Sequence, residues 1–97
     1  MTHPTHRLDR VSATAADWGL RRPKELGEDE RRRPLSAVAT DLNGRLKECC
    51  KSAYSPSEAA REMRRHMDLF ARYGVPNAKA TQLVRDLTMK AFAPPKR

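Results

Sequence analysis

The feature that most constrains the fold is a pair of amphipathic helices over residues 55–93, joined by a short turn at residues 73–77. The turn holds Gly74 and Pro76, because glycine permits a sharp change of direction after a helix and proline cannot continue one. On both sides of the turn, apolar residues recur at spacings of three and four, the pattern of a helix that buries one face. The sequence therefore predicts a helical hairpin.

Capping signals mark the ends of the two hairpin helices. Ser55 precedes Pro56 and is followed three residues later by Glu58, which predicts a serine cap and a carboxylate that reaches back toward the preceding backbone. Asn77 is a favourable N-cap for the second helix, expected over residues 78–93. The two prolines that follow this helix end it.

The first hairpin helix carries a charged face opposite its apolar stripe. That face holds Arg61, Glu62, Arg64, Arg65, Asp68 and Arg72. Opposite charges four residues apart, such as Arg64 and Asp68, can interact locally. We therefore expect most of this face to be solvated rather than a binding patch, and we expect His66 at its edge to be structural.

A further amphipathic helix is predicted upstream, over residues 36–54. Its apolar residues share one face: Leu35, Val38, Leu42, Leu46, Cys49 and Ala53. Cys49 and Cys50 are neighbours, and disulfide geometry excludes a bridge between adjacent helical residues, so we expect both to be small core residues. None of the three histidines lies at ligand spacing from them, and neither a metal site nor a cofactor is predicted.

The first third of the chain is predicted to be a charged arm that leads into this helical unit. A short helix is expected at residues 7–18, with Gly19 as its C-terminal stop. Residues 21–34 combine prolines, a glycine and blocks of opposite charge, a composition that leaves little to bury and predicts an extended linker. Trp18 has two open roles: it closes the core within the chain, or it anchors a partner.

Composition narrows the class of function. The chain has 97 residues, 38% hydrophobic and 33% charged, which supports one small helical core rather than a deep substrate cavity. The sequence contains no phosphate-binding glycine loop and no nucleophile–base arrangement, so we expect a protein that is not an enzyme. The net charge of +8 favours a polyanionic partner, and residues 75–97 hold five basic residues against one acidic residue.

Together these patterns predict an all-α fold: a small helical bundle or αα-hairpin of two to three packed helices, with a short N-terminal helix and an extended charged linker. We divide the chain into an arm, residues 1–34, and a helical unit with a basic tail, residues 35–97. The chain starts without an apolar signal segment and has no run long enough to cross a membrane. A reducing intracellular compartment is therefore expected, cytoplasmic or organellar, and membrane binding is not favoured.

The predicted function is binding, as a small basic accessory or structural subunit that docks on a larger acidic or polyanionic assembly. Such an assembly could be a ribonucleoprotein, a cytoskeletal filament or a multiprotein complex. The residues expected to contact it are Trp18, Arg31, Arg32, Arg33, Lys96 and Arg97. The alternative is a helix-turn-helix DNA-binding regulator built from residues 57–93. Its second helix would then meet bases and phosphates through Lys79, Gln82, Arg85 and Lys90. The partner and the oligomeric state stay open.

Overall fold

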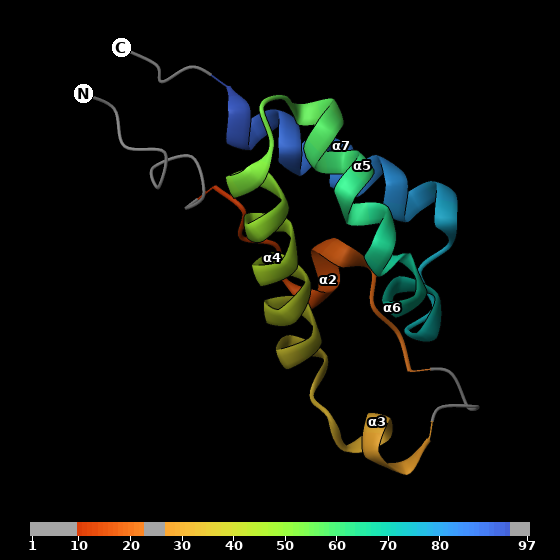
Figure 1. The fold of residues 1–97 in the computed structure, drawn as a ribbon. Helices are drawn as coiled ribbons and strands as arrows, with labels where there is room; N and C mark the ends of the chain where they lie inside the picture. Colours follow the sequence, from red (N-terminus) through yellow and green to blue (C-terminus); the bar gives the residue numbers. More distant parts are fainter. Residues whose placement is uncertain (1–9, 23–26, 94–97) are drawn as a thin grey trace.

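Three helices that pack against one another form the body of the structure (Figure 1). They are α4 (Leu35–Ser52), α5 (Pro56–Met63) and α7 (Asn77–Phe92). The computed structural model describes residues 10–22 and 27–93. Within these ranges every regular element is helical, so the predicted all-α fold is confirmed.

Short helical segments complete the described fold. Two of them, α2 (Ala15–Trp18) and α3 (Glu28–Arg32), precede α4 in the chain. A turn of 3₁₀-helix (Arg64–His66) and then α6 (Met67–Arg72) connect α5 to the tight turn before α7. The hairpin predicted from the sequence is therefore present, with α5, the 3₁₀ turn and α6 as its first arm and α7 as its second.

The hairpin helices begin and end close to where the sequence predicts. The Ser55 hydroxyl accepts a hydrogen bond from the Glu58 backbone N–H at 3.2 Å, and the Glu58 carboxylate reaches back to the N–H of Tyr54, also at 3.2 Å. Gly74 follows α6 with a φ of 73°, in the left-handed region where glycine meets no steric cost. α7 includes Asn77 as its first residue, so Pro76 rather than Asn77 holds the capping position.

The first arm of the hairpin is interrupted, whereas its apolar spacing predicts one continuous helix. The interruption is the 3₁₀ turn at Arg64–His66, which has fewer residues per turn and so rotates the side chains that follow it relative to those before it. Before the turn, α5 packs against α4 and α7. After it, Phe70 of α6 packs on Trp18, with ring centroids 5.2 Å apart and an interplanar angle of 60°. Both halves of the arm pack against α7, and each has one further partner: α4 for α5, and Trp18 for α6.

Residues 10–22, which the sequence places in the arm of residues 1–34, are packed into the helical unit. Trp18 has no exposed surface, and its indole N–H donates to Oδ1 of Asn43 on α4 at 2.9 Å. The same Oδ1 accepts from the backbone N–H of Ala13 at 3.2 Å, and the Asn43 amide donates to the Ala13 carbonyl at 2.8 Å. One side chain of α4 thus satisfies three polar groups of this segment.

Two further contacts hold the ends of the same segment. The Arg10 guanidinium donates to the carbonyls of Lys90 and Ala93, each at 3.0 Å. These carbonyls lie at the C-terminal end of α7, where helical partners are missing and the helix dipole favours a cation. At the other end, the Arg21 backbone N–H donates to the Tyr73 carbonyl at 2.7 Å. The segment therefore bridges α4, the C-terminal end of α6 and the C-terminal end of α7.

The N-terminal helix is shorter than the predicted span of residues 7–18, because Thr14 starts it late. The Thr14 hydroxyl accepts from the Asp17 N–H at 3.0 Å, and the Asp17 carboxylate accepts from the Thr14 N–H at 2.9 Å. The bond from the Thr14 N–H to the carboxylate lowers the pKa of the Asp17 carboxyl, and the Thr14 side chain lowers it further. Residues 7–9 lie outside the described residues. Gly19 ends α2 with a φ of 72°, as predicted.

The linker predicted over residues 21–34 is not extended throughout, since α3 lies within it. The Arg22 guanidinium donates to the backbone carbonyls of Arg31 and Arg33. These two hydrogen bonds hold the C-terminal end of this short helix. Arg33 in turn pairs with Asp41 on α4 at 3.2 Å. Some of the charge of this segment is therefore used within the chain.

Cys49 and Cys50 are both buried, as predicted for small core residues. Burial raises the pKa of the Cys49 thiol, and the nearby Glu62 carboxylate raises it further, which keeps the thiol protonated at neutral pH.

In the part of the chain that the structure describes, no helix has both the length and the apolar character of a membrane span.

Candidate functional site

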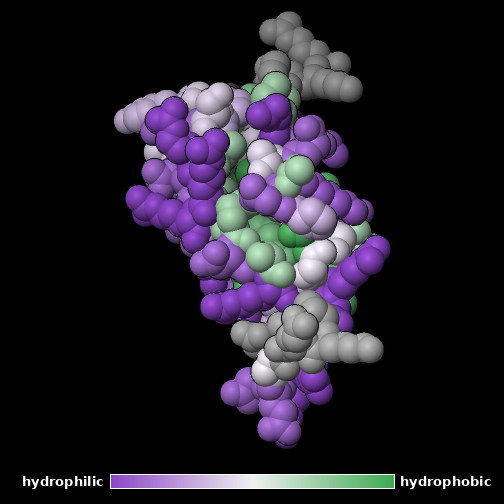
Figure 2. Space-filling model, turned by 90° about the vertical axis from the view of Figure 1, so that its right-hand side faces the viewer, coloured by the Kyte–Doolittle hydropathy of each residue, from purple (hydrophilic) through white to green (hydrophobic). Residues whose placement is uncertain are grey.

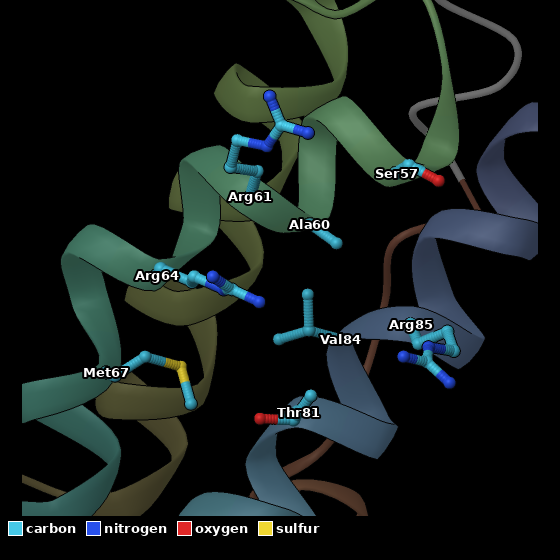
Figure 3. Close-up of a pocket in the computed structure, with 8 residues that line it drawn as sticks. All are labelled: Ser57, Ala60, Arg61, Arg64, Met67, Thr81, Val84 and Arg85. Carbon is cyan, nitrogen blue, oxygen red and sulfur yellow. The ribbon is translucent and has the colours of Figure 1, made fainter.

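A groove of about 240 Å³ lies between α5 and α7, with basic side chains along an apolar floor (Figure 3). Arg61 of α5, Arg64 of the 3₁₀ turn and Arg85 of α7 line it, and they are called the groove arginines below. The hydroxyl-bearing residues Ser57 and Thr81 also line it. The floor consists of the remaining lining residues: Ala60, Met67 and Val84.

Helical spacing places these side chains along the two edges of the groove. Ser57, Arg61 and Arg64 follow one another at intervals of four and three residues, which puts them on one face of the first hairpin arm. Thr81 and Arg85 are four residues apart and share a face of α7. Because the tight turn brings α7 back along α5, the two rows lie across from each other (Figure 3).

The groove arginines carry charges that no ion pair of the described residues uses. Arg61, Arg64 and Arg85 are all exposed, and no carboxylate belongs to the lining. No salt bridge among residues 10–22 and 27–93 includes them, whereas the neighbouring Arg65 pairs with Glu62 at 3.6 Å. Arginines that line one groove without a carboxylate have guanidinium groups available to an external anion.

The surface on this side of the molecule has an apolar centre. Figure 2 views the molecule from the right-hand side of Figure 1, where α5, α6 and α7 lie, and hydrophobic atoms gather at the middle of that face with hydrophilic side chains around them. A polar rim around an apolar centre is the layout of many binding interfaces.

α7 carries the four residues predicted for nucleic-acid contact, and the structure divides them between two faces. At about 100° per residue, Lys90 lies within about 20° of Lys79 around the helix, whereas Arg85 lies about 120° away. Arg85 lines the groove. Gln82 lies about 60° from both Lys79 and Arg85, and its amide donates to Asp86 at 2.9 Å. The lysine face, Lys79 and Lys90, is therefore separate from the groove, on the side of α7 that meets the N-terminal segment.

None of the residues predicted to contact a partner from the N-terminal arm lines the groove. Trp18 is in the core, the first of the two roles that the sequence left open. Arg31 and Arg32 are exposed on α3, and Arg33 is half-buried and paired with a carboxylate of α4. The other two predicted contacts lie outside the described residues: Lys96 and Arg97.

Sequence reasoning missed the groove because it treated each helix by itself. Arg61 and Arg64 were expected on a solvated face, and Arg85 was grouped with the other polar residues of α7. The available signal was the recurrence of Ser57, Arg61 and Arg64 at intervals of four and three along the charged face. What this row faces depends on how α7 folds back, which the spacing within one helix does not determine.

His66 belongs to a line of polar contacts that joins α4 to the 3₁₀ turn. Nη1 of Arg45 lies 2.8 Å from Nδ1 of His66, and Nε of Arg45 lies 3.1 Å from the Asp41 carboxylate. Because a guanidinium only donates, Nδ1 accepts the hydrogen bond and the imidazole is held neutral. Partial burial of the ring and the positive charge of Arg45 both lower the pKa of His66.

Folding stability is expected to fall as the pH drops from about 7.5 to about 5. The pKa of His66 is lowered from its ordinary value of 6.5 only in the folded state. As the pH falls, the imidazole is therefore protonated first in the unfolded chain. Stability that is present above pH 6.5 is therefore lost as the pH falls toward the folded-state pKa of His66. The lowered pKa values of Asp17 and Asp41 lie below 3.8, outside this window.

Urea unfolding of the wild type and of His66→Gln at both pH values tests this expectation. Glutamine can still accept from Arg45, so the variant keeps the contact without the titrating group. We expect a smaller loss of stability in the variant between the two pH values. An equal loss would assign the pH dependence to a different group.

In residues 10–22 and 27–93, no three His, Cys, Asp or Glu side chains gather where they could hold a metal ion. No protein-family model, curated protein or solved structure matches the chain. The geometry of the arginine groove is therefore the basis for a function.

Proposed function

We propose that this chain is a non-enzymatic binding protein: a small basic subunit that docks, through the groove arginines, on a polyanionic surface of a larger assembly. The observation that supports this function is one groove lined by three exposed arginines from two facing segments, with no carboxylate in its lining. A reducing intracellular compartment suits the buried thiols of Cys49 and Cys50.

Arginine is well suited to this task. Its planar guanidinium presents several N–H donors in a fixed fork, which matches the oxygens of phosphates and carboxylates and is less strongly hydrated than an ammonium group. The net charge of +8, to which the three groups contribute, also attracts a polyanion over a longer range. Binding of this kind releases counterions from the polyanion. The entropy gained from this release falls as the salt concentration rises, so the binding weakens.

Elution from immobilised heparin along a salt gradient tests this function. The groove variant replaces all three groove arginines by glutamine. A matched control likewise replaces by glutamine three basic residues outside the groove: Lys47, Lys51 and Arg65. Both variants therefore lose the same charge. We expect the groove variant to elute at clearly lower salt than the control. Equal elution of the two variants would mean that net charge alone drives binding, and would contradict a docking role for the groove.

A third variant separates the DNA-binding alternative from the groove. It replaces Lys79, Gln82 and Lys90 of α7 by alanine and leaves the groove arginines in place. If α7 were a recognition helix, this variant would lose duplex DNA binding more than the groove variant does. We expect the opposite order, because Asp86 lies between the two lysines and is bonded to Gln82.

A further inference from the structure

Two large hydrophobic side chains of the described residues are strongly exposed, and both belong to segments that continue from groove residues. Tyr54 is 93% exposed and Met89 is 58% exposed. Tyr54 lies in the turn before α5, three positions before the groove residue Ser57. Met89 follows the groove residue Arg85 by one helical turn of α7. Neither side chain belongs to the groove lining, but each lies within four residues of one that does.

The position of Tyr54 is fixed although its ring is exposed. Its backbone N–H donates to the Glu58 carboxylate at 3.2 Å, and the next residue, Ser55, caps α5. The ring therefore projects from a hydrogen-bonded turn rather than from a free end. Proteins stack unpaired bases on exposed aromatic rings held near basic side chains, and Tyr54 is such a ring on a fixed backbone three positions before the groove residue Ser57.

Building on the polyanion-binding function above, we propose that the ligand of this site is a single-stranded nucleic acid. Its phosphates bind the groove arginines, and an unstacked base lies on the Tyr54 ring. Guanidinium planes also stack on bases, so Arg61 and Arg85 can serve both phosphate and base. The floor of Ala60, Met67 and Val84 gives base edges or sugar carbons an apolar surface.

Charge alone would also accept a nucleic-acid duplex or an acidic protein segment, but the apolar features favour a single strand. In a duplex the bases are stacked on one another, so a tyrosine ring cannot stack on them. The convex duplex backbone would contact the rims of the groove and leave its floor uncovered. Carboxylate side chains of an acidic protein would occupy the groove arginines without using the Tyr54 ring. A flexible single strand uses both.

Fluorescence anisotropy with labelled probes of equal length tests the ligand class. The probes are twelve-residue oligouridylate, oligothymidylate, an abasic strand with the same phosphates, a duplex of mixed sequence and polyglutamate. We expect either single strand with bases to bind at least about tenfold tighter than the abasic strand, because stacking adds to the phosphate contacts. The ratio of oligouridylate to oligothymidylate then distinguishes RNA from DNA.

Two sets of variants assign the two parts of the site. Tyr54→Ala is expected to weaken oligouridylate binding about tenfold with an unchanged salt dependence, and Tyr54→Phe to bind within about twofold of wild type. The groove variant is expected to lower the slope of log affinity against log salt by about 2, since each phosphate contact on a single strand contributes about 0.7. Because Tyr54 is 93% exposed, thermal melts of its variants are expected to match wild type.

The outcomes separate this ligand class from the function on which it depends. Equal binding of the abasic strand, or tighter binding of the duplex or polyglutamate, would overturn the single-strand inference and leave polyanion docking in place. Wild-type binding of every probe by the groove variant would overturn both.

Discussion

Replacing Trp18 by alanine is expected to lower the free energy of unfolding by about 3–5 kcal/mol, the usual cost of deleting a fully buried large aromatic side chain. Trp18 has no exposed surface and its ring lies 5.2 Å from that of Phe70, so the truncation leaves a cavity where α2 meets α6. It also removes the indole donor to Asn43. Small domains are stable by about 5–15 kcal/mol, so this loss is a large share of the total.

Urea unfolding followed by circular dichroism measures this loss, since the variant has no tryptophan fluorescence. Tyr54→Ala is the control, because it removes an aromatic ring that is exposed, and its effect should stay within about 0.5 kcal/mol. A loss for Trp18→Ala no larger than that of the control would contradict the placement of residues 10–22 in the core.

Asn43→Ala is expected to cost about 2–4 kcal/mol, because it leaves three polar groups without their partner. The Asn43 side chain binds the N–H and the carbonyl of Ala13 and the indole N–H of Trp18, at distances of 2.8–3.2 Å. All three contacts are partly buried, so water replaces them only in part. The substitution therefore loosens the N-terminal segment from α4.

Asn77→Ala provides the matched control for Asn43→Ala. Asn77 is exposed at the start of α7 and its side chain makes no capping hydrogen bond, so a change within about 0.5 kcal/mol is expected. Amide hydrogen exchange gives a second readout, since the Ala13 N–H should lose its protection only in Asn43→Ala. Retained protection there would show that the segment is held by other contacts.

Local signals in the sequence predicted the hairpin and its ends. The Ser55 cap, the Gly74 stop and the apolar spacing of α4 and α7 act over three or four residues, so each could be identified without knowing the rest of the fold. The burial of Cys49 and Cys50 follows from the same spacing.

Contacts between distant segments could not be predicted in this way. Ala13 and Asn43 are thirty positions apart, and nothing in the polar sequence around either residue indicates the other. The 3₁₀ turn at residues 64–66 interrupts the helix where no glycine or proline marks a break in the sequence. The groove has the same origin, because Arg85 joins Arg61 only through the return of α7 along α5.

The central claim, that the groove arginines bind the anion, is tested most directly by NMR of the arginine side chains. The Nε–Hε resonances of ¹⁵N-labelled protein are followed while oligouridylate is added at low salt. We predict that the resonances of Arg61, Arg64 and Arg85 shift together, whereas that of Arg65, paired with Glu62, changes little. Shifts confined to the arginines of α3, with the three groove resonances unchanged, would contradict the claim.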